Sequence, residues 1–326
     1  MAYQTGSATS QNDLLQQLAA WLVTQGWALD ASQADGAGWR AHLHKSGHYL
    51  HLKTLPTGSP FNGQVAVGQI PGLYCYMSSS FAGVGQNWYA NLAGAPLGTD
   101  GRVCGVGIVV AAGANTSFHF FNDGEDNYTI VVERSAGLFQ VMGFGMSLIR
   151  HGGDWPGGAF LHGQMSGAHA LSTSTVAGSN SLCPFHYGTA ESTAANGALV
   201  RIDIDGFTGN WVAIGPMVNA TGNYPRANWT GKQGFSTVYR ANTLPASIPH
   251  TNALVAYLTS SVNSQAVLLP VRIYVLLNEG GPCLIGTAPS VWQSNAVGNG
   301  FLAGAEISLG PDTYKLFPEF AVRKVV

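Results

Sequence analysis

Four of the ten histidines lie between residues 40 and 52, in the sequence RAHLHKSGHYLHL. Imidazole nitrogens can bind zinc or iron, exchange protons near neutral pH, or form structural hydrogen bonds. Ser46 and Gly47 separate two stretches in which polar and apolar residues alternate. A small residue followed by Gly suits the positive φ angles of a two-residue turn, so the segment is predicted to form a β-hairpin.

Such a turn pairs Lys45 with His48 and His42 with His51, and it sorts the side chains onto two faces. One face is apolar, with Ala41, Leu43, Leu50 and Leu52. The other is polar, with Arg40, His42, His44, Tyr49, His51 and Lys53. Three imidazoles therefore share one face of the hairpin.

His42, His44 and His51 could hold zinc or iron and leave one coordination position open for water. Arg40 and Lys53 on the same face disfavour a dication, and no nearby carboxylate offers a fourth ligand. We therefore expect a polar face covered by solvent or by a neighbouring subunit, and no bound cofactor. The three-histidine metal site is the alternative.

Other candidate sites have simpler explanations. Asp203 and Asp205, with Arg201 beside them, could act as general acid and general base in glycoside cleavage. The same residues also suit a solvated strand edge. The sequence NDGEDN at 122–127 could bind calcium, or simply form a polar hairpin loop. Walker A and G-x-S-x-G motifs are missing, so we do not expect an enzyme.

The composition favours a subunit of an assembly. Charged residues make up 9% of the 326-residue chain, and the net charge is −2. An isolated soluble protein normally carries about 25% charged residues. So few charges suit a surface covered by other subunits, and they offer no attraction to nucleic acid or to an anionic membrane.

No secretion signal or membrane span is expected from the sequence. The longest apolar run, 266–277, contains Pro270 and Arg272 and is too short to cross a bilayer. The cysteines are scattered and are predicted to be reduced, buried small side chains. They are Cys75, Cys104, Cys183 and Cys283.

The order of elements predicts an α+β fold that is mainly antiparallel β, with sandwich-like or meander sheets. An amphipathic helix is expected to begin after Ser10 and end at Gly26, and a three-stranded meander to cover 117–149. Residues 166–197, rich in Ser, Thr, Ala and Gly, are predicted to link domains at 1–165 and 198–326, or to form an arm that contacts a neighbouring copy.

Several longer stretches resemble a family of tailed-bacteriophage virion proteins encoded among tail genes. They are TSQNDLLQQLAAWLVTQGW followed by GWRAHLHKSGHYLHL, FHFFNDGEDNYTIVVERSAGLFQVMGFGMSL running into GGDWPGGAFLHG, RIDIDGFTGNW, and LGPDTYKLFPEF. The resemblance covers most of the chain. Phage tail tips hold iron with His-x-His strands at a needle apex, whereas HLH here lies near a helix close to the N-terminus.

The resemblance implies a structural subunit of the tail or baseplate, assembled in the host cytoplasm and located in the virion. Its expected partners are copies of itself, as a trimer or hexamer, and other phage tail proteins. A lectin-like receptor-binding role, a glycan-degrading role at the host surface, or a histidine metalloprotein remain the alternatives. No nucleic-acid binding and no membrane insertion are expected.

Overall fold

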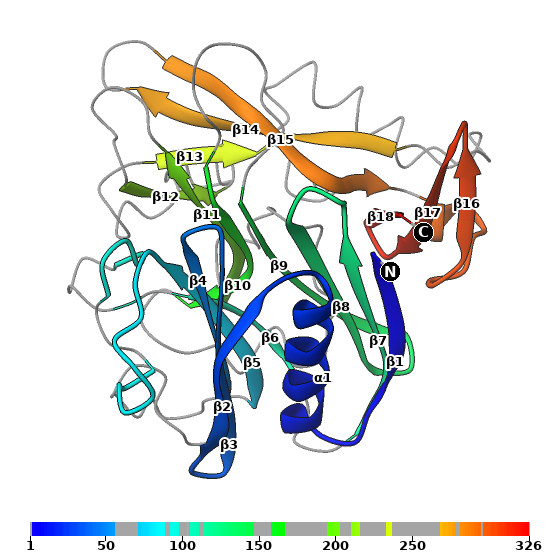
Figure 1. Ribbon diagram of the computed structural model, residues 1–326. Helices are drawn as coiled ribbons and strands as arrows, with labels where there is room; N and C mark the ends of the chain where they lie inside the picture. The colour runs from blue at the N-terminus through cyan, green and yellow to red at the C-terminus, as the bar shows by residue number, and fades with distance from the viewer. Residues whose placement is uncertain are drawn as a thin grey trace.

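The structure is a computed structural model in which antiparallel β-strands dominate and one α-helix, α1 (Gln11–Thr24), lies near the N-terminus of the described residues (Figure 1). The described residues are 2–55, 71–88, 92–97, 103, 105–110, 114–146, 158–166, 194–202, 210–215, 233–236, 268–277, 281–294 and 296–325. The predicted fold class, β-rich α+β with an N-terminal helix, is confirmed. Within these residues no helix is long and apolar enough to cross a membrane.

Helix α1 begins and ends as its sequence predicts. The Ser10 side chain accepts a hydrogen bond from the Asp13 backbone N–H at 3.1 Å, which caps the first turn. Gly26 has a φ of +90°, a left-handed conformation that ends the helix at no cost in strain. The predicted stripe of Leu14, Leu18 and Leu22 is fully buried.

The first sheet runs in the order β2, β3, β4, β5, β6, with every neighbouring pair antiparallel. Its strands are β2 (Ala28–Asp35), β3 (Gly38–Lys45), β4 (His48–Leu55), β5 (Gly72–Ser78) and β6 (Val106–Val109). Lys45 pairs with His48 and His42 with His51, as predicted. Ser46 and Gly47 have φ angles of 49° and 77°, which confirms the two-residue turn.

The second sheet runs in the order β1, β7, β8, β9 and is also antiparallel. Its strands are β1 (Tyr3–Ala8), β7 (Asn115–Asn122), β8 (Asn127–Ser135) and β9 (Leu138–Gly145). The predicted meander is confirmed by β7, β8 and β9. Its expected end, at residues 147–149, lies outside the described residues.

Strand β10 (Phe160–Ser166) joins the two sheets. One of its edges pairs with β9 near Phe160 and with β6 at Gln164, and its other edge pairs with β11. From β11 the ladder continues through β12, β13, β14, β15, β18 and β17 to β16. These strands are β11 (Ala194–Ile202), β12 (Asn210–Gly215), β13 (Gln233–Ser236), β14 (Leu268–Leu277), β15 (Gly281–Ser294), β16 (Glu306–Leu309), β17 (Asp312–Phe317) and β18 (Phe320–Lys324), with a 3-10 helix at Ala296–Asn299.

The largest apolar core forms where α1 packs against both sheets (Figure 1). The Trp21 ring lies 5.4 Å from Phe120 of β7 and 5.8 Å from Tyr128 of β8. The apolar face of the β3–β4 hairpin is part of this core, because Leu43 and Leu50 are fully buried in it. Because this face packs into the core, the histidines of the hairpin lie on the opposite face of the sheet.

A second core cluster contains residues from both sides of the predicted linker, among them Phe160 and Val322. The linker prediction itself falls on residues 166–197, of which 194–197 belong to β11 and 167–193 lie outside the described residues. The division into domains at 1–165 and 198–326 therefore stays a prediction.

Ser290 offers a stabilising substitution. It has a φ of +56°, its side chain is buried, and its hydroxyl has no hydrogen-bond partner among the described residues. Ser290→Gly should raise the free energy of unfolding by about 1 kcal/mol, because Gly adopts this φ without strain and no unpaired hydroxyl remains. Urea unfolding measures the change, and a variant less stable than wild type would contradict it.

Candidate functional site

The polar face of the first sheet places histidines of β3 and β4 in one row with a tyrosine of β5. His42 pairs with His51, which pairs with Tyr76 on β5. Residues 79–88, which follow β5 and which we call the covering segment, lie over this face. Phe81 of the covering segment stacks on the His42 ring, with ring centroids 4.7 Å apart.

The face is therefore neither solvated nor left for another subunit to cover at its centre. His42 is 1% exposed and His51 is fully buried by the same chain. This corrects the expectation of a face open to solvent or to a neighbouring subunit. The alternation of residues 40–52 defines two faces, but it carries no information about a distant segment that folds over one of them.

The buried histidines form a directed chain of hydrogen bonds. The Ser78 hydroxyl donates to the Ser80 carbonyl oxygen at 2.6 Å, so it must accept from His51 Nε2 at 2.7 Å. A neutral His51 then has a bare Nδ1, which accepts from His42 Nδ1 at 2.7 Å. The contacts thus define the tautomers, with the proton on Nδ1 of His42 and on Nε2 of His51.

Burial keeps both histidines neutral. It lowers the pKa of His42 to about 4, and the positive charge of Arg40 adds to this effect. Burial also lowers the pKa of His51 well below its usual range, with a further contribution from His42. Neutral imidazoles allow the two rings to lie next to each other without charge repulsion, and they complete the hydrogen-bond chain.

The third histidine of the proposed metal set faces a different partner. His44 Nδ1 lies 2.8 Å from Asp30 Oδ1, on the partly exposed margin of the sheet. Across the described part of the chain, no group of three or more His, Cys, Asp or Glu side chains is placed to hold a metal ion. The structure thus brings His42 and His51 together and leaves His44 apart, and a metal at all three stays a prediction.

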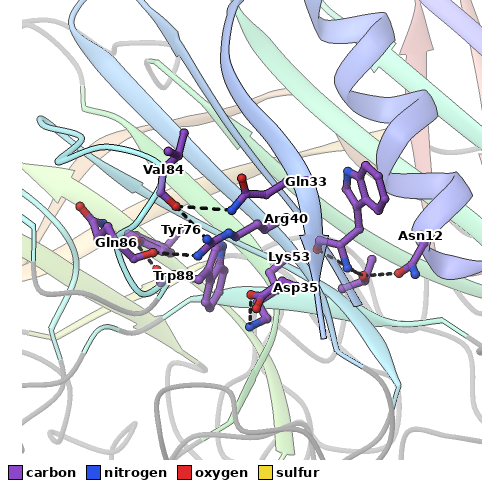
Figure 2. Close-up of polar contacts among 11 residues, drawn as sticks. Asn12, Gln33, Asp35, Arg40, Lys53, Tyr76, Val84, Gln86 and Trp88 are labelled. Carbon is purple, nitrogen blue, oxygen red and sulfur yellow. Dashed lines mark hydrogen bonds and ion pairs between the residues drawn. The ribbon is translucent and has the colours of Figure 1, made fainter. Parts of the chain in front are cut away.

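Arg40 fastens the covering segment to the sheet (Figure 2). Its guanidinium donates from Nη1 to the Gln86 carbonyl oxygen at 2.7 Å and from Nη2 to the Val84 carbonyl oxygen at 2.8 Å. The Tyr76 hydroxyl donates to the Trp88 carbonyl oxygen at 2.6 Å, deeper in the sheet. The cation expected to disfavour a metal on this face therefore binds backbone carbonyls instead.

Neighbouring polar contacts hold the sheet and helix in place. Lys53 forms an ion pair with Asp35 at 2.7 Å (Figure 2). The Thr54 hydroxyl accepts from the Trp39 backbone N–H at 2.7 Å and donates to Asn12 Oδ1 of α1 at 2.5 Å. These bonds connect the end of the hairpin to the helix.

The 122–127 loop is organised by its own side chains. Asp123 Oδ1 accepts from the backbone N–H groups of Glu125 at 2.7 Å and Asn127 at 3.2 Å. Asp126 forms an ion pair with Lys45, with Oδ1 and Nζ 2.5 Å apart. These contacts match the polar hairpin loop considered as the alternative to calcium binding.

Two further sequence predictions concern the pair of aspartates and the cysteines. Asp203 and Asp205 lie outside the described residues. Cys75 is a free thiol and fully buried in β5, and burial raises its pKa, as expected for a cysteine that packs as a small apolar side chain.

No protein-family model matches the chain, and a search of curated proteins finds no match.

Sequence reasoning missed the covering segment and Ser78. Ser78 is placed beside His51 by the pairing of β4 with β5, whose strands are separated by residues 56–71. A connection of that length fixes no register by turn geometry, so the sequence offered no signal for this partner.

Replacing Arg40 with Met should loosen the covering segment. Two hydrogen bonds to carbonyls are lost, so local opening should become easier by about 2 kcal/mol and amide exchange in residues 84–88 about 30-fold faster. Hydrogen exchange followed by mass spectrometry measures this, with Gln16→Met on the exposed face of α1 as the control. Unchanged exchange in residues 84–88 would show that Arg40 does not fasten the segment.

Proposed function

We propose that this protein is a structural subunit of a tailed-bacteriophage virion, located in the tail or baseplate. It acts by assembling with copies of itself and by contacting other tail proteins. The resemblance of its longer stretches to phage tail-gene products supports this proposal, as does a chain with 9% charged residues. The structural observation that supports it most is that most charged side chains of the described β-sheets form ion pairs within the subunit.

Most charged side chains of the described β-sheets pair with one another within the same subunit, at partly exposed positions. Lys45 pairs with Asp126, Lys53 with Asp35, and Glu306 lies 3.5 Å from Lys315 and 3.0 Å from Lys324. Arg40 binds carbonyl oxygens of its own chain. A chain with few charges that also pairs them internally leaves a nearly neutral surface, which suits burial between subunits better than free solution.

The histidine pair supports a structural role as well. A general base needs an accessible nitrogen with a pKa near the working pH, and a nucleophilic serine must donate its proton to a base. Burial lowers the pKa of His42 to about 4, and Ser78 donates to a carbonyl oxygen instead of to His51. The same residues serve well as a buried polar connection between β3, β4 and β5.

Electron microscopy of intact virions, with antibodies raised against the purified chain, tests the proposal. We expect labelling at the tail or baseplate in several copies per particle. Absence of the chain from virions would overturn it. Turnover of host-surface glycans by the purified chain, or stoichiometric metal in elemental analysis, would overturn the purely structural role and favour the glycan-degrading or metalloprotein alternative.

A further inference from the structure

Three described strands pair along one edge only, namely β1, β2 and β16. The path of paired strands begins at β2, which pairs only with β3 among the described strands, and ends at β16, which pairs only with β17. Both are exposed: Leu29 of β2 is 46% exposed and Leu309 of β16 is 43% exposed. In Figure 1 the β16–β17 hairpin stands at one side of the molecule and β2 at another.

An open edge presents backbone N–H and C=O groups that only another extended strand can satisfy as a ladder. Natural proteins commonly block such edges with Pro or Lys. Neither β2, with the sequence ALDASQAD, nor β16, with the sequence EISL, contains Pro, Lys or Arg. β2 has a bulge between Leu29 and Ala31, and β16 is four residues long, so the free backbone of each edge fits a short added β-strand.

The edge of β1 differs from these two. The Tyr3 ring lies 4.9 Å from Lys324 Nζ and 5.9 Å from Lys315 Nζ, and its hydroxyl lies 2.9 Å from His119 Nδ1. Side chains of the C-terminal hairpin thus already contact β1. Gln17 of α1 also donates to the Ser7 carbonyl oxygen of β1 at 3.1 Å, so β1 is contacted from both the C-terminal hairpin and the helix, and β2 and β16 are the edges considered further.

We propose that β2 of one copy pairs with β16 of the next copy, so that successive copies close into a ring. The inference rests on the proposed function, because it supplies the contact by which the subunit would self-assemble. A pair of two different edges is heterologous, and repetition of such a contact gives a ring when the rotation closes. This agrees with the trimer or hexamer expected from the resemblance.

Charge favours this pair over two copies of β2. The charged residues of β2 are Asp30 and Asp35. Lys53 already pairs with Asp35, so pairing β2 with itself brings the two Asp30 carboxylates to one junction. Glu306 of β16 lies beside both Lys315 and Lys324, which leaves an excess of one positive charge at that edge. Leu29 and Leu309 give each edge an exposed apolar side chain that the contact would bury.

Edge-blocking variants test the proposal. Ala34→Pro blocks β2 and Ser308→Pro blocks β16, and both native side chains are exposed. Multi-angle light scattering should show a ring for wild type and a monomer for each variant. An equimolar mixture of the two variants should give a dimer, because each variant keeps the edge that the other has lost.

Folding is checked separately by near-UV circular dichroism. If a proline variant does not fold, Ala34→Lys and Ser308→Lys block the same edges with an exposed charge, and Gln16→Lys on α1 is the matched control that should still form the ring.

Different results overturn different claims. If Ser308→Pro assembles like wild type while Ala34→Pro does not, the contact is β2 with β2 and the proposal is wrong. A monomeric wild type, or variants that assemble normally, would also overturn it. These outcomes are read in solution, whereas the proposed function fails only if the chain is absent from virions or turns over glycan.

Discussion

Acidification from neutral pH to about pH 4 is expected to unfold the protein, because several histidines are buried in their neutral form. Burial lowers the pKa of His42 and His119 to about 4 and that of His162 to about 3, and it lowers the pKa of His51 well below its usual range. All four side chains are less than 9% exposed.

The direction follows from where protons bind. The unfolded chain takes up protons as the pH falls below the ordinary histidine pKa of 6.5, whereas the folded chain does not until about pH 4. The contribution of these histidines to stability is therefore fully present above pH 6.5 and is lost as the pH falls toward 4. At about 1.4 kcal/mol per pH unit, His42, His119 and His162 each lose about 3 kcal/mol, so these three together lose on the order of 10 kcal/mol, and His51 adds to the loss in the same direction. That is comparable to the whole stability of a typical domain.

Carboxylates act in other ways. The hydrogen bond from the Thr9 backbone holds the pKa of Asp13 below its usual value, so the contribution of Asp13 is lost only at still lower pH. Burial raises the pKa of Asp123, so the folded form takes up that proton more readily and this group opposes the histidine effect. One carboxyl group is too few to offset four histidines.

Urea unfolding followed by tryptophan fluorescence, repeated at several pH values, measures the effect. His42→Gln should reduce the loss of stability between pH 6.5 and 4, because one titrating group is removed. Gln16→Asn, at an exposed position of α1 and without a titratable group, is the control and should leave the loss as in wild type. A free energy of unfolding that stays constant across this range would contradict the prediction.

Gly143→Ala is expected to destabilise the fold by about 3 kcal/mol or more. Gly143 of β9 pairs with Thr129 of β8 and His162 of β10, so it lies between two strands. A Cβ at this position would overlap the Tyr128 carbonyl oxygen and the His162 ring. The carbonyl belongs to the β-ladder and cannot move aside without loss of hydrogen bonds.

The same urea assay measures this change. Gly85→Ala in the covering segment is the control, because a Cβ there meets no atom within 4 Å, and its stability should equal that of wild type. His162→Ala in the Gly143→Ala background should not restore stability, since the Tyr128 carbonyl remains. If Gly143→Ala unfolds at the wild-type urea concentration, the close approach of β8, β9 and β10 is wrong.

Local rules predicted the elements of the N-terminal half well. The pairing of His42 with His51 follows from a single turn, because Ser46 and Gly47 fix the register of every residue in the hairpin. The helix follows from its cap and its leucine stripe. In both cases the controlling contacts lie within a few residues of each other along the chain.

The environment of the histidines could not be predicted in the same way. Phe81 covers His42 from 39 positions further along the chain, and Ser78 reaches His51 across 27 positions. Such contacts depend on where β5 docks beside β4, and nothing in the alternation of residues 40–52 reports it. Sequence correctly placed the three imidazoles on one face, but it gave their surroundings as solvent or a neighbour instead of the same chain.

The contact between Tyr3 and Lys324 also has a mechanical consequence. The Lys324 Nζ lies 4.9 Å from the Tyr3 ring, so a side chain of β18 reaches β1 although the two residues are far apart in the sequence. A tensile force applied between these two residues would act across a short span. It would peel β1 from β7 and β18 from its neighbours before any tension reached α1 or the histidine pair, which would keep the interior unloaded during the first extension.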